Sequence, residues 1–139
     1  MPFDRVDDTG AAGLGRLEAV AVVCAEPALA EAVVAALDRL GIGAERFAGV
    51  EAFLAQRPET LDCVVVDVDM QARGAPDLIA DLVRRAHAVP VVVIAPPAGI
   101  ASAVRAMRAG AADYLERPVA PNVVADRVAA QIRHGRPRH

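Results

Sequence analysis

The sequence predicts one α/β domain, built as a parallel five-stranded sheet with helices on both of its faces. Hydrophobic residues make up 55% of the 139 residues, which is enough apolar material for a single buried core. Short apolar runs rich in valine alternate with segments in which apolar residues recur at helical spacing. Such alternation is typical of a parallel sheet whose strands are joined by right-handed helical crossovers.

Five apolar runs are expected to form the strands. The first and third runs, LEAVAVVC and LDCVVV, have the composition of strands buried on both faces, and the second run is weak. The last is a short strand that ends before Pro118. The expected strands are Leu17–Cys24, Ala44–Phe47, Leu61–Val66, Val89–Ala95 and Asp113–Glu116.

Five helices are expected between and after these strands. Pro27 and Pro76 suit the first turn of a helix, and Gly41 and Gly110 suit its end. Apolar residues at helical spacing mark the helices that begin at Pro27 and Pro76, a short helix at Val50–Arg57, a helix around Ile100–Met107 and a last helix around Val123–Ile132.

The domain is expected to cover residues 17–133. Residues 1–16 hold three glycines and no apolar period, which predicts a flexible lead-in, and residues 134–139 are expected to be a solvated tail or a truncated linker. The polar start does not resemble a signal peptide, and no apolar run is long enough to cross a bilayer. The expected location is therefore the cytoplasm.

Composition argues against several kinds of partner and cofactor. The net charge of −3 and the absence of tryptophan predict that this domain does not itself bind nucleic acid. Cys24 and Cys63 are expected at opposite ends of two strands, too far apart for a disulfide. Cys63 is expected in the core, and Cys24 is interpreted as a small filler, with a reactive thiol as the alternative. The three histidines are isolated, so no metal site is expected from them.

The functional site is expected where the strands end. In open parallel sheets, ligands and reactants lie beyond the carboxyl ends of the strands, at the point where the strand order switches. Asp67 directly follows the most strand-like run of the chain, so it is the first candidate.

Two segments of the sequence resemble the receiver domain of bacterial response regulators. They are VVVDVDM at residues 64–70 and AVRAMRAGAADYLERP at residues 103–118, and the resemblance extends over roughly residues 17–133. It implies a flavodoxin-like sheet with strand order 2-1-3-4-5. It also implies that Asp67 stands at the phospho-acceptor position and Tyr114 at the aromatic switch position on the fifth strand. The style of FAGVEAFL and AVRAMRAG is similar to receivers that carry a DNA-binding output domain.

The other positions of the resemblance depart from the receiver pattern. The acidic pair that holds Mg²⁺ in the family is replaced by Cys24 and Ala25, and the switch hydroxyl by Ala95. Arg117 stands at the position of the family's lysine, and Gln71 at that of a proline. The resemblance therefore implies an atypical receiver with a degenerate acidic pocket. Asp7–Asp8 is rejected as the acidic pair because no strand precedes it and no helix follows it.

Three residues near Asp67 leave alternatives open. Glu26 and Asp69 either compensate for the lost metal ligands or serve only as a helix-terminal acid and a solvated loop acid. Arg117 is either a drifted lysine, in a chain in which all fifteen basic residues are arginine, or a partner that pairs directly with Asp67. We expect a standing Asp67–Arg117 ion pair. Tyr114 is expected to be a fixed part of a protein-binding face, because Ala95 has no hydroxyl that could couple to it.

The favoured interpretation is an atypical receiver that works through protein–protein contacts, with weak or no Mg²⁺-dependent phosphorylation at Asp67. It is not expected to be an enzyme or to hold a cofactor. Its expected partners are a histidine kinase or an output domain. A second copy is also expected, bound through the face formed by the helix around Ile100–Met107, the strand Asp113–Glu116 and the last helix.

Two alternatives remain. One is a receiver that still accepts a phosphoryl group at Asp67, with Glu26 or Asp69 assisting the metal. The other is a small-molecule-binding domain on the same fold. A flavin is disfavoured because CAEPALAE, after the first strand, is no glycine-rich phosphate loop.

Overall fold

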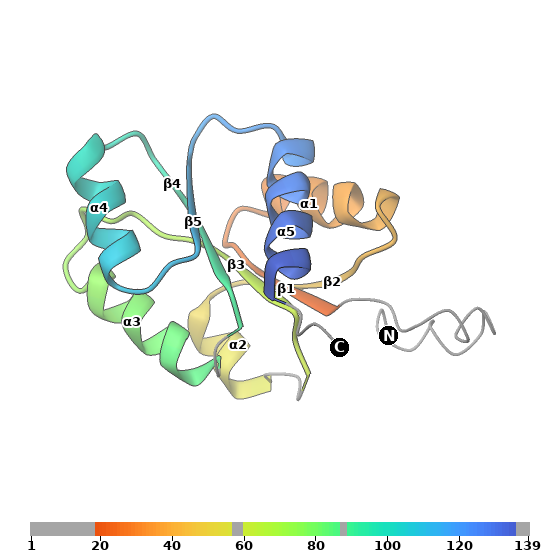
Figure 1. Ribbon diagram of the computed structural model, residues 1–139, viewed down its shortest axis with the longest axis horizontal. Helices are drawn as coiled ribbons and strands as arrows, with labels where there is room; N and C mark the ends of the chain where they lie inside the picture. The colour runs from red at the N-terminus through yellow and green to blue at the C-terminus, as the bar shows by residue number, and fades with distance from the viewer. Residues whose placement is uncertain (1–18, 57–59, 87–88, 136–139) are drawn as a thin grey trace.

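Strands and helices alternate along the chain, as the sequence predicts (Figure 1). The computed structural model describes residues 19–56, 60–86 and 89–135. The predicted lead-in and the last four residues of the predicted tail lie outside these ranges. The strands are β1 (Ala19–Val23), β2 (Gly43–Phe47), β3 (Cys63–Asp67), β4 (Val91–Ala95) and β5 (Asp113–Glu116). The helices are α1 (Pro27–Arg39), α2 (Val50–Gln56), α3 (Ala75–Arg85), α4 (Ile100–Arg108) and α5 (Pro121–Gly135).

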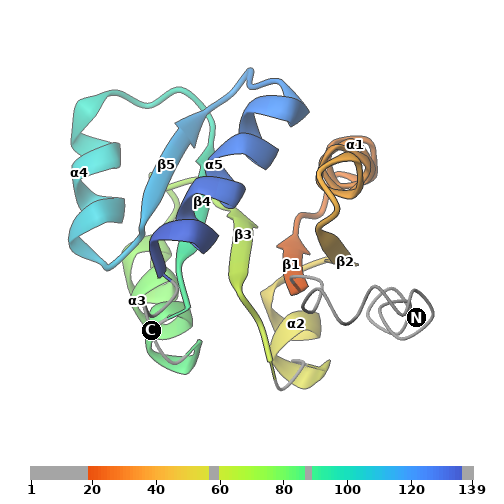
Figure 2. The same ribbon diagram turned by 45° about the vertical axis from the view of Figure 1, so that its right-hand side comes forward.

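All five strands run parallel, in the order β2-β1-β3-β4-β5, which confirms the predicted strand order. Helices α1 and α5 cover one face of the sheet, and α2, α3 and α4 cover the other (Figure 2). Within the described residues, no helix has the length and apolar character that a membrane crossing requires. Because β1 and β3 run parallel, their carboxyl ends lie at the same edge of the sheet, and the strand order switches between these two strands.

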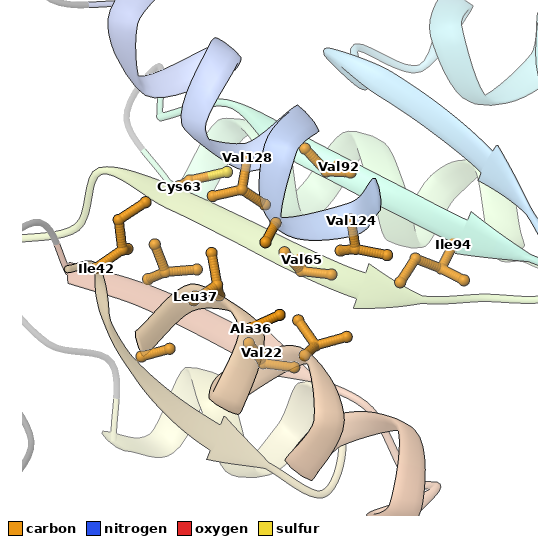
Figure 3. Packing of buried hydrophobic residues seen from close by; sticks show 14 of the residues in the cluster. Val22, Ala36, Leu37, Ile42, Cys63, Val65, Val92, Ile94, Val124 and Val128 are labelled. Atoms are coloured by element: carbon orange, nitrogen blue, oxygen red, sulfur yellow. The ribbon is translucent and has the colours of Figure 1, made fainter. Parts of the chain in front are cut away.

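The core has two parts because neighbouring residues of each strand point to opposite faces. Val22 and Val65 pack with Leu37 of α1 and Val128 of α5 on one face (Figure 3). The strand residues that alternate with these point to the other face and pack against α2, α3 and α4. Phe53 of α2, which is 1% exposed, is part of this second cluster. The central strands are therefore valine-rich throughout, because both of their faces are buried.

Several element bounds differ by a few residues from those predicted. Asp67 is the last residue of β3 rather than the residue after it, because it pairs in register with Ile94 of β4. Strand β4 begins at Val91 instead of Val89, and α3 begins at Ala75, one residue before Pro76. Helix α5 continues to Gly135, two residues past the predicted end of the domain at residue 133.

Gly110, after α4, is a position where only glycine fits without strain. Its φ of +115° lies in the left-handed region, and a Cβ atom here would lie 3.1 Å from Cγ1 of Val83 on α3. The turn lets α4 pack beside α3 and leads the chain directly into β5. The glycine in the AGA segment, which the sequence marked only as a helix end, also permits this close helix packing.

The two leucines near the end of α1 test the burial pattern. Leu37 is fully buried and Leu40 is 49% exposed, so they are a matched pair for the same substitution. We expect Leu37→Ala to lower the free energy of unfolding by about 2–5 kcal/mol, because it leaves a cavity in the core. Leu40→Ala is expected to change it by only about 0.5 kcal/mol. Urea unfolding of both variants measures the difference, and equal effects would contradict the packing of α1 described above.

Candidate functional site

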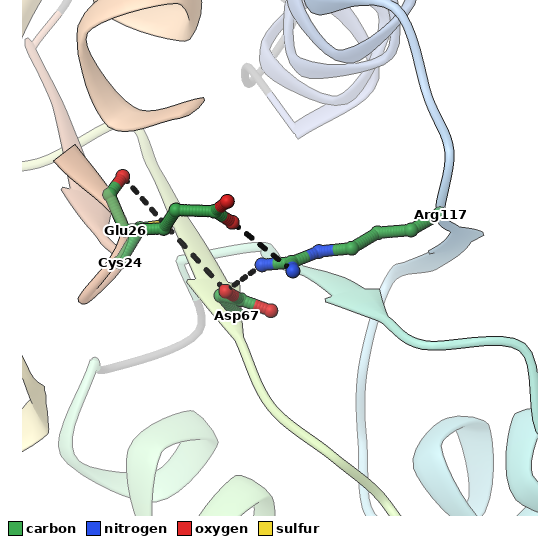
Figure 4. A network of polar contacts seen from close by, with 4 residues as sticks. All are labelled: Cys24, Glu26, Asp67 and Arg117. Carbon is green, nitrogen blue, oxygen red and sulfur yellow. Dashed lines mark hydrogen bonds and ion pairs between the residues drawn. The ribbon is translucent and has the colours of Figure 1, made fainter. Parts of the chain in front are cut away.

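Four side chains meet at the carboxyl edge of the sheet: Cys24, Glu26, Asp67 and Arg117 (Figure 4). Asp67 ends β3, Cys24 follows β1, and Glu26 is the N-cap residue of α1. Arg117 follows β5 at the start of the loop to α5. Cys24 and Glu26 come from the connection between β1 and α1, whereas Asp67 and Arg117 come from the ends of β3 and β5. The parallel sheet brings these segments together because its strands all end at one edge.

Arg117 is the centre of the cluster. Its backbone N–H donates to the carbonyl oxygen of Ala95 at 2.8 Å, which fixes where its side chain starts. From there the guanidinium pairs through Nη2 with Oδ2 of Asp67, and Nη1 lies 3.1 Å from Oε1 of Glu26. The predicted Asp67–Arg117 ion pair is therefore confirmed. The Nε atom of Arg117 is buried and has no hydrogen-bond partner among the described residues.

The two ion pairs of Arg117 differ in their exposure. The side chains of Asp67 and Arg117 are 17% and 31% exposed, whereas that of Glu26 is 56% exposed. Exposed pairs contribute little to stability because water screens them, and a shielded pair interacts more strongly. Arg117 is therefore held mainly by Asp67, and Glu26 is the partner that is more easily exchanged.

The thiol of Cys24 completes the surroundings of Asp67. Its Sγ lies 3.5 Å from Oδ2 of Asp67 and 3.6 Å from the carbonyl oxygen of Glu26, both of which accept hydrogen bonds. Burial raises the pKa of the Cys24 thiol, and the Asp67 carboxylate adds to this effect. Cys24 is thus a neutral thiol that donates to the carboxylate, which agrees better with a packing role than with a reactive one. Both cysteines of the chain are free, in agreement with the predicted absence of a disulfide.

Opposing effects act on the acidity of Asp67. Burial is the largest, and it raises the pKa of the carboxyl above that of an ordinary aspartate. The guanidinium of Arg117 and the thiol of Cys24 lower it, and the Glu26 carboxylate raises it further. The effect of burial prevails, so the charged form of Asp67 is less favourable than it would be in water. The guanidinium of Arg117 is the main group that stabilises this charged form.

The side chains at the two predicted switch positions, Ala95 and Tyr114, take no part in this cluster. Ala95 is fully buried and offers only its backbone carbonyl, which Arg117 uses. Tyr114 is half-buried on β5 and packs against the core between the sheet and helices α2 to α4. Its hydroxyl is buried without a hydrogen-bond partner among the described residues, and burial raises the pKa of that hydroxyl, with Glu116 and Asp69 acting in the same direction.

The residues present do not fit Mg²⁺, the metal that the resemblance implies. Mg²⁺ prefers hard oxygen ligands, but the positions after β1 hold the soft thiol of Cys24 and the exposed methyl of Ala25. Glu26 is turned toward Arg117, and Asp69 accepts a hydrogen bond from the N–H of Gln71 in its own loop, at 2.9 Å. Across residues 19–56, 60–86 and 89–135, no group of three His, Cys, Asp or Glu side chains is arranged to hold a metal ion.

A cleft next to the cluster was not foreseen from the sequence. It has a volume of about 430 Å³ and is lined by Glu26, Leu29, Pro97, Arg117, Pro118 and Val119. The contacts of Cys24 with Asp67 and of Glu26 with Arg117 were also not predicted. The strand order held a signal for the first contact, because β1 and β3 are neighbours. The second contact depends on the path of the loop after β5, for which the sequence holds no such signal.

Comparison with known proteins points to one family. The family model of the response regulator receiver domain matches residues 20–129, well over half of the chain. The chain is 32% identical over 100 residues to the transcriptional regulatory protein FixJ of Azorhizobium caulinodans, which covers 71% of this chain and 47% of that protein. It is 29% identical over 102 residues to FixJ of Bradyrhizobium diazoefficiens, which covers 73% of this chain and 50% of that protein. The chain thus spans about half the length of these relatives.

A solved structure shows the same similarity in three dimensions. A response regulator receiver protein from Pseudoalteromonas atlantica matches 85% of this chain and 99% of its own chain, with a TM-score of 0.73 and 26% sequence identity.

The acidity of Asp67 gives a direct test of the cluster. We expect its carboxyl to titrate above the ordinary aspartate pKa of about 3.9. In Arg117→Ala the pKa should rise further, because the guanidinium is the strongest influence that lowers it. Carbon-13 NMR titration of the side-chain carboxyl measures both values. A pKa that stays the same or falls in Arg117→Ala would contradict the pairing.

The same shift has a defined effect on stability. Because the folded-state pKa of Asp67 is raised, Asp67 favours folding at pH values below the unfolded pKa, and this contribution is lost as the pH rises through the folded pKa. In Asp67→Asn this part of the pH dependence should be missing. Urea unfolding at a series of acidic pH values, compared between the wild type and the variant, provides the check.

Proposed function

This chain belongs to the response regulator receiver domain family, and we propose that it acts in the cytoplasm as an atypical receiver that works through protein–protein contacts. We further propose that Mg²⁺-dependent phosphorylation of Asp67 is weak or absent and that the domain is not an enzyme. The observation that carries the proposal is the engagement of Asp67 by Arg117 and Cys24 at one and the same oxygen, Oδ2.

The chemistry of phosphoryl transfer supports this proposal. A carboxylate that attacks a phosphoryl group needs a free oxygen lone pair, and a highly charged phosphodonor needs cations that offset its charge. Two donors already hold Oδ2 of Asp67, and the guanidinium that lies closest is shared with Glu26, so its charge is committed to carboxylates and not to an incoming phosphodonor. The only carboxylate just after β1 is that of Glu26, and it is paired with Arg117.

The proposed partners are proteins of a signalling pathway. The two FixJ relatives are named transcriptional regulatory proteins, and this chain spans only about half of their length. A histidine kinase or an output domain is therefore the proposed partner. With a net charge of −3, the domain is not expected to contact nucleic acid itself.

A second copy of the chain is the further proposed partner, bound through α4, β5 and α5. On α4 the side chains of Ile100, Val104 and Met107 are 82%, 40% and 46% exposed. They are spaced four and three residues apart, so they share one side of the helix. On α5, Val123 is 37% exposed. Exposed apolar residues gathered in this way favour a protein-binding face.

Phosphorylation can be tested with a small phosphodonor. We expect the chain to show no phosphoryl adduct in intact mass spectra after incubation with acetyl phosphate and Mg²⁺, because Asp67 is engaged by Arg117. A well-characterised receiver treated in the same way serves as the positive control. An adduct on the wild-type chain that disappears in Asp67→Ala would establish the alternative function, a receiver that still accepts the phosphoryl group.

The dimer can be tested by sedimentation velocity. We expect the wild-type chain to form dimers in a concentration-dependent manner, and Val104→Glu to remain monomeric because it places a charge within the apolar side of α4. Leu40→Glu, at a similarly exposed leucine at the end of α1, is the matched control and should still dimerise. A wild-type chain that stays monomeric, or equal loss in both variants, would refute this face as the interface.

A further inference from the structure

We propose that the cleft beside Arg117 binds a free α-amino acid with an apolar side chain. This inference goes beyond the protein-contact function and does not depend on it. The cleft is the one described above, between the start of α1 and the loop that follows β5. Its position fits the general rule that small ligands of open parallel sheets bind beyond the carboxyl ends of the strands.

The class of ligand is inferred from the two charged residues of the cleft wall. Two of the six residues that line it are charged, and they have opposite signs: the Glu26 carboxylate and the Arg117 guanidinium. Their charged atoms lie 3.1 Å apart, so together they can bind two neighbouring, oppositely charged groups of one ligand. An α-amino acid carries such a pair, with its ammonium for Glu26 and its carboxylate for Arg117.

The Glu26–Arg117 contact can open at little cost. Glu26 is 56% exposed, and such exposed pairs contribute little to stability. Arg117 would keep its contact with Asp67 through Nη2, while the Glu26 carboxylate moves aside and the ligand carboxylate takes its place at Nη1. The ligand then replaces one screened ion pair with two pairs inside the cleft, while Asp67 remains neutralised.

The rest of the cleft wall is apolar, which favours a ligand with an apolar side chain. Leu29 and Val119 are half-buried and pack against the core between the sheet and helices α1 and α5. Pro97 and Pro118 complete the lining and are rigid, so little conformational entropy is lost there when a ligand binds. A volume of about 430 Å³ lies in the range of small-molecule sites. A branched aliphatic side chain such as that of leucine suits this wall.

A second cleft of about 400 Å³ lies on the other side of α1 and helps to define the control. It also holds an ion pair, between Glu31 and Arg46 at 3.0 Å, together with apolar residues. It differs in having a further carboxylate, that of Asp38, and in lying against β2 at the border of the sheet. A ligand carboxylate there would lie beside two carboxylates instead of one, so this cleft is a matched site that should not bind the amino acid.

The test is a nitrogen-15 NMR titration with four probes. L-Leucine carries both charges and the aliphatic body, 3-methylbutan-1-amine lacks the carboxylate, 4-methylpentanoate lacks the ammonium, and glycine lacks the aliphatic body. We expect saturable shifts of the Glu26, Leu29, Arg117 and Val119 amides, with leucine binding at least about tenfold more tightly than each of the other probes, because every one of them loses a charged contact or the apolar contact.

Two variants complete the experiment. Glu26→Gln should weaken leucine binding by about tenfold or more, because a charge-assisted contact is lost. Glu31→Gln, at an exposed carboxylate in the second turn of α1, should leave leucine binding unchanged. Any of four results would overturn the proposal: no saturable shift with leucine, shifts centred on Glu31 and Arg46, equal binding of a singly charged probe, or no effect of Glu26→Gln. The amide spectrum of each variant shows that it is folded, and none of these readouts depends on phosphorylation or dimerisation.

Discussion

The guanidinium of Arg117 is the interaction on which the carboxyl edge of this domain depends. It neutralises an aspartate whose burial would otherwise be unfavourable, and it connects the loop after β5 to the end of β3 and the start of α1. Removal of one partner from a shielded pair leaves the other charge without compensation, which costs more than the pair contributes. Asp67 and Arg117 are therefore each constrained by the other, and the pair is one structural unit.

This unit also explains the neighbouring residues. With a fixed cation already present at Asp67, further carboxylates after β1 would add negative charge that only a metal could offset. A thiol and a methyl group occupy those positions, and the thiol still donates to the carboxylate. Glu26, one residue further on, lies close enough to Arg117 for a second, exposed contact. The result is an edge of the sheet at which a single arginine pairs with two carboxylates.

Most of the fold could be predicted from the sequence, because valine-rich runs and helical spacing are governed by burial on both faces of the sheet. The strand order, however, came from the resemblance, not from the runs themselves. Strand ends were placed less well: Asp67 belongs to β3 through its register with Ile94, and a register depends on the partner strand. The ion pair with Arg117 could be predicted because both residues stand at the carboxyl ends of strands that finish at one edge of the sheet. The contact of Glu26 and the cleft could not, because they depend on loop paths that no periodicity encodes.

The buried hydroxyl of Tyr114 has a practical consequence. The chain has one tyrosine and no tryptophan, so its near-ultraviolet absorbance and its fluorescence come almost entirely from this one ring. The ring lies on β5, three residues before Arg117, and its hydroxyl has no hydrogen-bond partner within the described part of the chain. Hydrogen bonding and solvation alter the emission of a phenol. The domain thus carries a built-in optical reporter of β5, which follows this strand in solution without any attached dye.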